Sequence, residues 1–388
     1  MTLSSPLAAQ HEQAGATFTE FAGWRMPVRY DSDLAEHHAV RQRAGLFDLS
    51  HMGELEVHGA DAGRFLDHAL VGHLSVLAPG RARYTMLCAP DGGVLDDLVV
   101  YRLEDERFLI VANAANTPTV LRELRDRAAG FAAAIEDVGA RTALLALQGP
   151  AAAGVLGGLL TGGLGDGDGD AGGGAQALAA LPYYAAAPAV VAGHPVLLAR
   201  TGYTGEDGFE LYADAEVAPE LWQRLLDAGS GAGVVPCGLA ARDTLRLEAG
   251  MPLYGQELGA DRTPYEAGLG RIVKLDKPGG FVGRDALAAR AARAEDADAE
   301  ADAGGERLVG LTAAGRRAPR PGYHVLDARG EAVGRVTSGA LSPTLGVPIA
   351  MAYVPVGYDQ PGRHLAVDVR GTALAVEVTP LPFYRRKG

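Results

Sequence analysis

The sequence contains few cysteines and no long apolar run. Cys88 and Cys237 lie far apart and belong to no CxxC pair or Cys/His cluster, which argues against a disulfide framework and a structural zinc site. No stretch approaches about 18 uninterrupted apolar residues, and residues 1–13 lack the basic and apolar regions of a signal peptide. We therefore expect a cytoplasmic protein with two buried thiols.

Positive charge is also scarce. The 388 residues include 35 Lys or Arg against 48 Asp or Glu, which gives a formal charge of −13. Because nucleic-acid binding depends on clustered basic groups, we expect no nucleic-acid partner, and any anionic ligand must meet local positive charge. The length predicts two or three domains of about 100–200 residues each.

The common catalytic motifs are missing. No GxGxxG follows a predicted strand, and GxxxxGK[ST], GxSxG and HExxH do not occur. The histidines of the segments at 36–38 and 50–52 complete no metal-ligand set, so structural or substrate-path roles are favoured for them. The sequence thus lacks the parts of ordinary nucleotide-binding proteins, serine hydrolases and zinc proteases.

Two stretches interrupt the regular pattern. Residues 151–174 are glycine-rich, with an Asp/Gly alternation at 165–170, and predict a loop or insertion because ordering glycine has a large entropic cost. A calcium loop is not expected there because its terminal Glu is absent. Residues 288–306 are rich in Ala, Glu, Asp and Arg and predict an exposed helix or linker.

Short strands with turn signals dominate the remaining sequence. The elements predicted before residue 288 include an antiparallel meander of strands at 84–88, 94–101 and 107–112, and helices at 33–44, 219–228 and 239–249. Beyond residue 306, apolar segments punctuated by Gly and Pro predict a small β-barrel. The predicted fold class is α+β, with mostly antiparallel sheets and an all-β C-terminal part.

Asp96 and Asp97 interrupt the apolar run at 94–101. Adjacent side chains on a strand point to opposite faces, so one carboxylate faces inward or into a cleft. An inward carboxylate is costly unless it is paired or used. The hairpin would place Tyr84 near Asp97. Two interpretations fit, an edge strand whose charges block aggregation and a catalytic carboxylate.

Glycines at 202, 205 and 208 surround Tyr203, and Glu210 follows on the next predicted strand. These glycines allow a tight turn that presents the aromatic ring. A carboxylate at this place can accept two parallel hydrogen bonds from an amino-pyrimidinone edge. A hairpin with a solvated Glu fits the periodicity equally well.

Arg242 lies in the first turn of the helix predicted at 239–249, and Arg246 follows one turn later. A guanidinium beside the free N–H groups of a helix N-terminus forms an anion site. The alternative is a surface pair between Asp243 and Arg246.

Several segments, taken in order, are similar to one family. They are GWRMP (23–27), EHHAVR (36–41), FDLSHM (47–52), GVLDD (93–97), LQGP (147–150), TGYTGE (201–206), the block at 237–250, LYGQE (253–257) and TSGALSPTLG (337–346). Together they closely resemble the aminomethyltransferase, or T-protein, family of the glycine cleavage system. The resemblance spans nearly the whole chain, apart from the glycine-rich insertion and the acidic linker.

The resemblance implies a three-domain cloverleaf around a central folate site. The implied parts are a discontinuous folate-binding domain at 1–50 and 140–287 that carries the insertion at 151–174, an α+β domain with the meander at 51–139, an acidic linker at 288–306 and a β-barrel domain at 307–388.

It also implies a reaction. The family takes the aminomethyl group from the dihydrolipoyl arm of H-protein, passes the one-carbon unit to tetrahydrofolate, and releases ammonia and 5,10-methylenetetrahydrofolate, with no metal or nucleotide. The matching positions are Asp97 as the catalytic aspartate, Glu210 as the pterin-binding carboxylate, Tyr84 and Tyr203 as folate-lining aromatics, Arg242 as the folate-contacting arginine, and Tyr101 and Asn113 as further folate-site residues. Lipoylated H-protein and tetrahydrofolate are the expected partners, with no membrane.

Two segments depart from the family pattern. Residues 264–269 continue into Gly270-Arg271 where family members often carry Trp, which puts local packing in doubt. The tail ends early relative to relatives that use a C-terminal side chain on folate, so Arg385 and Arg386 are candidate contacts for the glutamyl tail of folate.

Alternative functions share the folate-binding fold. One is a tetrahydrofolate-dependent demethylase, or the one-carbon half of a sarcosine or dimethylglycine dehydrogenase, whose usual flavin domain does not fit here. The other is a noncatalytic folate-binding factor for iron–sulfur maturation. That group carries a cysteine signature, whereas residues 252–257 contain no thiol.

Overall fold

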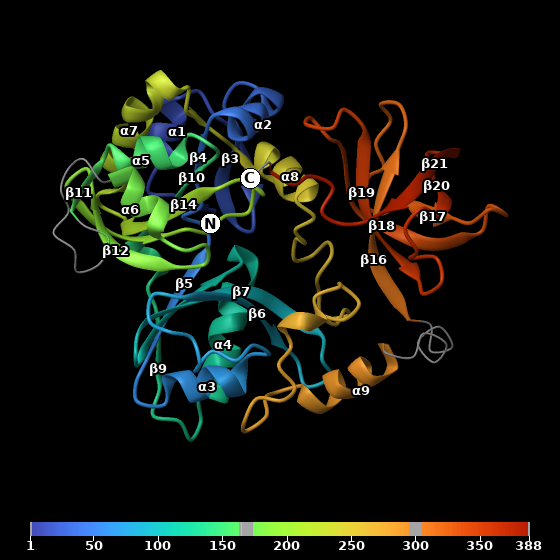
Figure 1. The fold of residues 1–388 in the computed structure, drawn as a ribbon, viewed down its shortest axis with the longest axis horizontal. Helices are drawn as coiled ribbons and strands as arrows, with labels where there is room; N and C mark the ends of the chain where they lie inside the picture. Colours follow the sequence, from blue (N-terminus) through green and yellow to red (C-terminus); the bar gives the residue numbers. More distant parts are fainter. Residues whose placement is uncertain (1, 163, 165–173, 295–304, 387–388) are drawn as a thin grey trace. The chain divides into compact units, whose positions relative to one another are not determined.

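The computed structural model describes residues 2–162, 164, 174–294 and 305–386 (Figure 1). The chain divides into two compact units. The first comprises Met1–Leu66, Leu74–Tyr84 and Leu98–Asp243, and the second comprises Asp67–His73, Thr85–Asp97 and Thr244–Gly388. The sheets are mostly antiparallel, so the α+β class predicted from the sequence is confirmed. The Asp/Gly alternation at 165–170 and residues 295–304 of the predicted linker lie outside the described residues.

The largest sheet lies in the first unit and has the strand order β11-β12-β13-β14-β10-β4-β15. Its strands are β4 (Gly45–Asp48), β10 (Thr142–Gln148), β11 (Leu160–Gly162), β12 (Ala186–Val191), β13 (His194–Ala199), β14 (Gly208–Asp214) and β15 (Val235–Pro236). All neighbours are antiparallel except β15 with β4. Glu210 on β14 lies between Ala146 of β10 and Ala199 of β13, near the centre of the sheet.

The α-helices are short. They are α1 (Ala8–Gln13), α2 (Asp33–Gln42), α3 (Ala62–Ala69), α4 (Thr117–Arg127), α5 (Ala152–Gly157), α6 (Gly174–Ala180), α7 (Ala218–Gly229), α8 (Leu239–Glu248) and α9 (Arg284–Ala294). Single 3-10 turns occupy η1 (Ala114–Asn116), η2 (Gly139–Arg141), η3 (Ser230–Ala232) and η4 (Gly270–Ile272). The predicted helices at 33–44, 219–228 and 239–249 are confirmed as α2, α7 and α8.

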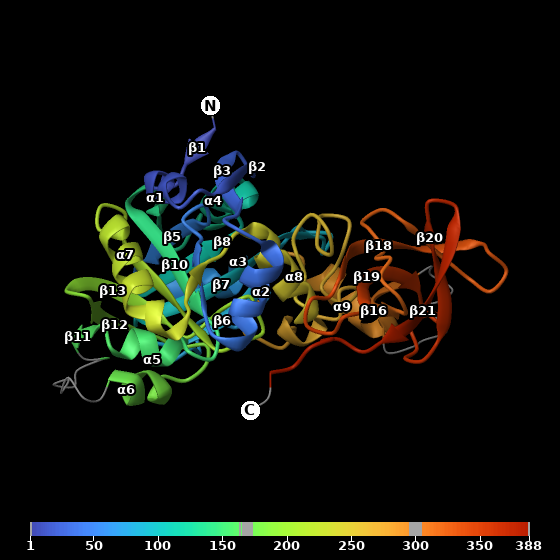
Figure 2. The ribbon, with the colours of Figure 1, turned by 90° about the horizontal axis from the view of Figure 1, so that it is seen from above.

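One face of the largest sheet packs against helices. α5 and α6 lie side by side on it together with α7 (Figures 1 and 2). Phe209 and Leu211 of β14 are fully buried in the same core as Trp222 of α7, and burying such side chains stabilises the fold by roughly 1.5–3 kcal/mol each. Side chains alternate along a strand, so Glu210 and Tyr212 lie on the opposite face. Strand β14 thus separates an apolar core from a polar face.

Two smaller sheets have the orders β1-β3-β2 and β6-β7-β8-β5-β9. Their strands are β1 (Leu3–Ser4), β2 (Thr17–Phe21), β3 (Trp24–Arg29), β5 (Gly53–His58), β6 (Ala82–Cys88), β7 (Val94–Glu104), β8 (Arg107–Ala112) and β9 (Ala134–Asp137). The predicted meander is confirmed as β6, β7 and β8, with β7 three residues longer than expected.

A buried polar network fastens the N-terminal segment to β4. Asp48, the last residue of β4, accepts a hydrogen bond from the Ser5 hydroxyl and one from the Ser50 N–H at 2.9 Å, and lies 2.8 Å from His11 Nε2. The other ring nitrogen of His11 lies 2.9 Å from the Tyr30 hydroxyl. Burial alone would raise the pKa of Asp48, but the hydrogen bonds and charge of His11 and the two serine contacts hold it below its ordinary value.

The second unit contains a closed barrel with the strand order β16-β19-β18-β17-β20-β21. Its strands are β16 (Glu306–Ala313), β17 (His324–Leu326), β18 (Ala332–Leu341), β19 (Pro348–Pro355), β20 (His364–Val369) and β21 (Thr372–Thr379). Small and branched apolar side chains, mostly Val, fill its interior. The predicted C-terminal barrel is confirmed, although the sequence pattern missed the short strand β17. The other predicted domain boundaries stay predictions.

Arg246 on α8 is a buried structural residue. Its Nη1 lies 2.9 Å from Glu257 Oε2, and its Nη2 donates to Ser338 Oγ of β18 at 2.7 Å. The side chain is 2% exposed. The alternative interpretation of Arg246, a surface pair with Asp243, is therefore wrong because Arg246 is buried.

Regular structure begins inside the stretch predicted as a loop at 151–174. Residues 152–157 form α5, and 160–162 form β11. Val155 and Leu156 pack into the core of the largest sheet. The helical spacing of these apolar residues outweighs the entropic cost of the glycines, so the loop prediction is wrong for α5 and β11.

Both cysteines are buried, as expected, and neither forms a disulfide bond. In the part of the chain that the structure describes, no helix is long and apolar enough to cross a membrane.

Candidate functional site

The Glu210 carboxylate is held by hydroxyl groups on the polar face of the largest sheet. Thr201 donates its hydroxyl hydrogen to Glu210 Oε2 at 2.5 Å, and the Thr201 and Tyr101 hydroxyl oxygens lie 2.9 Å apart. Tyr101 and Tyr212 point their hydroxyls at the same carboxylate oxygen at 3.4 and 3.5 Å. All three contacts fall on Oε2, and Oε1 receives none of them. The carboxylate is oriented by the protein and keeps Oε1 for another donor.

The two tyrosines remain protonated donors. Burial raises the pKa of Tyr101 well above its ordinary value, and the charge of Glu210 adds to the effect. Burial also raises the pKa of Tyr212, with contributions from Tyr101 and Glu210. The Tyr212 hydroxyl also lies 3.2 Å from that of Tyr101, so the three hydroxyls form one polar cluster around the carboxylate.

The turn that carries Tyr203 is fixed by Gln148. The Gln148 amide donates to Thr201 O at 3.1 Å, and its oxygen accepts from the Thr204 hydroxyl at 3.1 Å. A Cβ at Gly202 would lie 2.0 Å from the Gln148 side chain, so only glycine permits this approach. A Cβ at Gly208 would likewise lie 2.5 Å from the Gln148 side chain, so two of the three glycines in the sequence pattern are required by this packing.

Arg242 and Tyr203 lie together in the first unit. The Arg242 guanidinium carbon lies 4.7 Å from the centroid of the Tyr203 ring. Burial lowers the pKa of Arg242, while Tyr203 and Glu210 raise it, and the group stays cationic because its ordinary pKa exceeds 12. The start of α8 is fixed because the Gly238 N–H donates to Glu36 Oε2 at 2.8 Å. The structure thus brings a cation, an aromatic ring and the Glu210 carboxylate into one electrostatic neighbourhood.

Tyr84 and Asn113 also belong to the first unit. Tyr84 is a half-buried residue of β6, and Asn113 directly follows β8. The Asn113 carbonyl accepts hydrogen bonds from the Asn116 and Thr117 N–H groups at 2.9 and 3.0 Å, which begins α4. Their contact with folate stays a prediction.

Asp96 and Asp97 belong to the second unit, on β7. Asp96 is fully buried and Asp97 half-buried, so the predicted division of the two carboxylates between opposite faces is confirmed. Burial raises the pKa of Tyr254, and the charges of Asp96 and Asp97 add to this rise. A phenol therefore lies within electrostatic reach of both carboxylates. The predicted proximity of Tyr84 and Asp97 stays a prediction.

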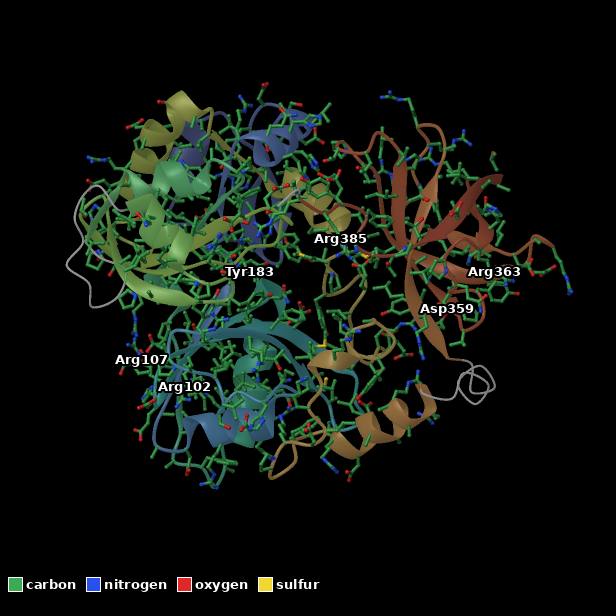
Figure 3. The ribbon with its side chains drawn as sticks, viewed as in Figure 1. Arg102, Arg107, Tyr183, Asp359, Arg363 and Arg385 are labelled. Atoms are coloured by element: carbon green, nitrogen blue, oxygen red, sulfur yellow. The ribbon has the colours of Figure 1, made fainter. Side chains whose placement is uncertain are left out.

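Arg385, which Figure 3 labels, and Arg386 are exposed on the tail after β21. The tail is attached to α8 because the Tyr384 N–H donates to Glu248 O at 2.8 Å. Folate contact by either arginine stays a prediction. Among the described residues, no group of three His, Cys, Asp or Glu side chains is placed to hold a metal ion.

Two family descriptions match the chain. Residues 7–277 match the GCVT N-terminal domain, and residues 306–385 match the Glycine cleavage T-protein C-terminal barrel domain. The chain belongs to the glycine cleavage T-protein family. Among its relatives, the protein from Saccharopolyspora erythraea named Aminomethyltransferase is 55% identical over 98% of this chain and 98% of the relative. The Aminomethyltransferase of Streptomyces coelicolor is 55% identical over 98% of this chain and 97% of its own.

A solved T-protein has the same fold. The crystal structure of glycine cleavage system aminomethyltransferase T from Bartonella henselae matches with a TM-score of 0.84 and 37% identity, over 99% of this chain and 98% of that one. The T-protein fold implied by the sequence motifs is therefore confirmed along nearly the whole chain.

Thr201 and Tyr212 are site residues that the sequence analysis did not select. Tyr212 follows Glu210 by two positions, so strand alternation alone places both on one face. Thr201 opens the motif at 201–206 but carries no feature that distinguishes it from an ordinary turn residue. Its role becomes visible only when the turn is folded over Glu210.

Proposed function

We propose that this T-protein family member is the aminomethyltransferase of glycine cleavage. It transfers the one-carbon unit from the aminomethyl-dihydrolipoyl arm of H-protein to tetrahydrofolate and releases ammonia and 5,10-methylenetetrahydrofolate. The observation that carries the proposal is the Glu210 carboxylate, oriented by three hydroxyl groups on the polar face of the largest sheet. The relatives' name, Aminomethyltransferase, supports the same reaction class.

Glu210 supplies the pterin contact. The amino-pyrimidinone edge of folate presents N–H donors, and an ionised carboxylate accepts them as charge-assisted hydrogen bonds. Because Thr201, Tyr101 and Tyr212 all approach Oε2, Oε1 keeps its lone pairs for the ligand. Because the protein already orients the carboxylate, little side-chain entropy is lost when the ligand binds.

Arg242 and Tyr203 supply a cation and an aromatic face. A flat conjugated ring packs against a tyrosine ring, and a guanidinium forms paired hydrogen bonds with a carboxylate or a carbonyl. Folate carries both kinds of group. Tyr84 and Asn113 are proposed as further folate contacts, and Arg385 and Arg386 as contacts of its glutamyl tail.

Asp97 supplies the catalytic carboxylate. It lies on β7 four positions before Tyr101, and strand alternation places side chains an even number of positions apart on one face of the strand. As a folate nitrogen attacks the aminomethyl carbon, the carboxylate stabilises the positive charge that develops on the nitrogen. It then accepts the proton that this nitrogen loses and passes it to the departing amine, which leaves as ammonia. Attack by the second folate nitrogen breaks the carbon–sulfur bond, and the proton of that nitrogen goes to the released dihydrolipoyl thiolate.

The test is the formation of 5,10-methylenetetrahydrofolate from purified protein, tetrahydrofolate and aminomethyl-loaded H-protein, with each component omitted in turn. Product that requires all three supports the transferase. If the protein binds folate but forms no product, the alternatives are tested with a methyl donor in place of H-protein. Transfer from that donor favours a demethylase of the same fold, and no transfer favours a noncatalytic folate-binding iron–sulfur maturation factor.

A cytoplasmic location stays a prediction.

A further inference from the structure

A cavity of about 210 Å³ lies at one end of the C-terminal barrel, and all residues that line it belong to the second unit. The connection 314–323 between β16 and β17 forms one wall, and the β20–β21 hairpin forms the other. The side chains that meet there are the apolar Val369, the ring of Tyr323, the hydroxyl of Thr372 and the guanidinium groups of Arg317, Arg320 and Arg370. A small volume is thus lined by three cations.

The topology of the barrel explains how this cavity forms. β16 pairs with β21 and β17 pairs with β20, so the connection between β16 and β17 has to cross the end of the β20–β21 hairpin. Val369, the last residue of β20, is buried in the barrel core, and the partly buried Tyr323 packs against the same core. The inner side of the cavity is therefore fixed and apolar, and the arginines lie on its exposed side.

The three arginines of the cavity are not engaged by acidic side chains. In the part of the chain that the structure describes, no hydrogen bond or ion pair involves the guanidinium of Arg317, Arg320 or Arg370. The chain carries a formal charge of −13, so acidic side chains are abundant elsewhere. Because like charges around one cavity repel one another, an anion bound among them is stabilised and relieves this repulsion.

The nearest acidic residue along the hairpin faces away from the cavity. Asp368 directly precedes Val369 on β20, so strand alternation places its side chain on the other face of the sheet. Its Oδ1 accepts a hydrogen bond from the Gly371 N–H at 2.6 Å, which ties the carboxylate to the hairpin turn. The positive charge of the cavity is therefore left for a ligand.

Arg370 has a backbone conformation that is unfavourable for arginine. It forms the two-residue turn of the hairpin with Gly371, and φ is 55° at Arg370 and 81° at Gly371. Positive φ at both central residues is the pattern of a type I′ turn, in which Asn-Gly is preferred because Cβ is strained at such φ values for most residues. An arginine kept at this position indicates a role for its side chain in the cavity.

The size and charge of the cavity fit a phosphate group. At about 30 Å³ per water molecule, the volume equals roughly seven waters, and it is below the roughly 300–1,000 Å³ of sites for larger ligands. A phosphate monoester carries a charge of about −1.5 to −2 and three terminal oxygens, and guanidinium groups bind such oxygens through charge-assisted hydrogen bonds. Three guanidiniums match three oxygens, whereas a carboxylate offers only two.

We propose that this cavity is a phosphate-binding site in which Arg317, Arg320 and Arg370 contact the phosphate oxygens. The ligand is inorganic phosphate or the phosphate group of a small ester, because the two share this chemistry. The site has no residue in common with the proposed folate site, so the proposal does not depend on the proposed function.

Titration calorimetry on the full-length protein tests the proposal with three probes. Inorganic phosphate and glycerol 3-phosphate distinguish the free ion from an ester, and malonate is a dianion without tetrahedral oxygens. Ionic strength is held constant because screening alone changes the binding of any anion. The variants are Arg317→Gln, Arg320→Gln and Arg370→Asn, with Arg329→Gln, at an exposed arginine between β17 and β18, as the matched control.

We expect at least one phosphate probe to bind, and malonate to bind at least about tenfold more weakly. Each cavity variant weakens phosphate binding at least about tenfold, and Arg329→Gln leaves it unchanged. Without ligand, Arg370→Asn also raises the unfolding temperature by about 1–4 °C, because Asn-Gly is preferred in this turn. This rise separates lost binding from lost folding.

Three results would overturn the proposal. They are the absence of binding by both phosphate probes, malonate binding as tight as phosphate binding, and phosphate affinity that is retained in the cavity variants. Equal losses in Arg329→Gln and the cavity variants would also overturn it, since they would show attraction to the overall charge of the barrel surface. If inorganic phosphate binds more tightly than glycerol 3-phosphate, the ligand is the free ion, and the reverse order identifies an ester.

Discussion

Thr201 and Glu210 are joined by a 2.5 Å hydrogen bond in which the threonine hydroxyl donates to the carboxylate. Thr201 follows β13 and Glu210 lies on β14, so the contact closes the turn that presents Tyr203 between them. The carboxylate is thus fixed by the chain rather than by a ligand. Binding to such a group avoids much of the entropic cost of ordering it.

Replacing Glu210 by Ala is expected to weaken folate binding by one to two orders of magnitude, about 1.4–3 kcal/mol, because a charge-assisted contact is lost. Titration calorimetry with a reduced folate measures the change. Glu216→Ala, at an exposed residue shortly after β14, is the control and leaves affinity unchanged. Equal affinities of Glu210→Ala and the unsubstituted protein would mean that the pterin is bound by other residues.

The two arginines of α8 are expected to respond differently to Met. Arg246→Met removes one partner of the buried pair with Glu257 and lowers the free energy of unfolding by about 3–5 kcal/mol. Arg242→Met lowers folate affinity at least tenfold and changes stability by less than about 1 kcal/mol. Denaturant unfolding and calorimetry on both variants check this. The reverse assignment, with folate affinity lost in a stable Arg246→Met, would contradict it.

Glu54 makes the stability of the first unit depend on pH. Its side chain is fully buried on β5, its oxygens have no hydrogen-bond partner among the described residues, and burial together with the charge of Asp137 raises its pKa well above the ordinary value. The folded state therefore holds a proton that the unfolded chain releases, so stability is lost as pH rises above the ordinary Glu range towards the folded pKa.

Glu54→Gln replaces the carboxylic acid with a neutral amide of the same shape. We expect its unfolding temperature to exceed that of the unsubstituted protein by at least about 2 °C at neutral pH, with a gap that widens as pH rises. Calorimetric scans at three pH values between 5.5 and 8.5 measure the gap. A gap that stays constant between pH 5.5 and 8.5 would show that Glu54 is already ionised in the folded protein.

The sequence predicted which face a side chain occupies wherever that depends only on strand alternation or helix spacing. The burial of Asp96 against the half-exposure of Asp97 follows from the period of two along β7. The same alternation places Glu210 opposite the core residue Phe209. The motif resemblance then joined these separate carboxylates into one expected site.

Contacts between residues that are distant in the sequence could not be predicted from these local patterns. Arg246 meets Ser338 across 92 positions, and Tyr101 meets Thr201 across 100. The loop prediction failed for residues 152–157 because it considered only their glycine content. It did not include the stabilisation from packing Val155 and Leu156 into the core. In each case the decisive contact is tertiary, and propensity gives no information about it.

Asp97 is the proposed catalytic carboxylate, and a single-turnover measurement separates its role in the reaction from folate binding. Wild-type protein, Asp97→Asn and Asp105→Asn, whose carboxylate is 86% exposed, are each mixed with aminomethyl-loaded H-protein and tetrahydrofolate, and 5,10-methylenetetrahydrofolate is followed in time. We expect a rate at least about 100-fold lower for Asp97→Asn, with folate affinity within about threefold of the wild type, and an unchanged rate for Asp105→Asn. An Asp97→Asn rate equal to that of the wild type would contradict it.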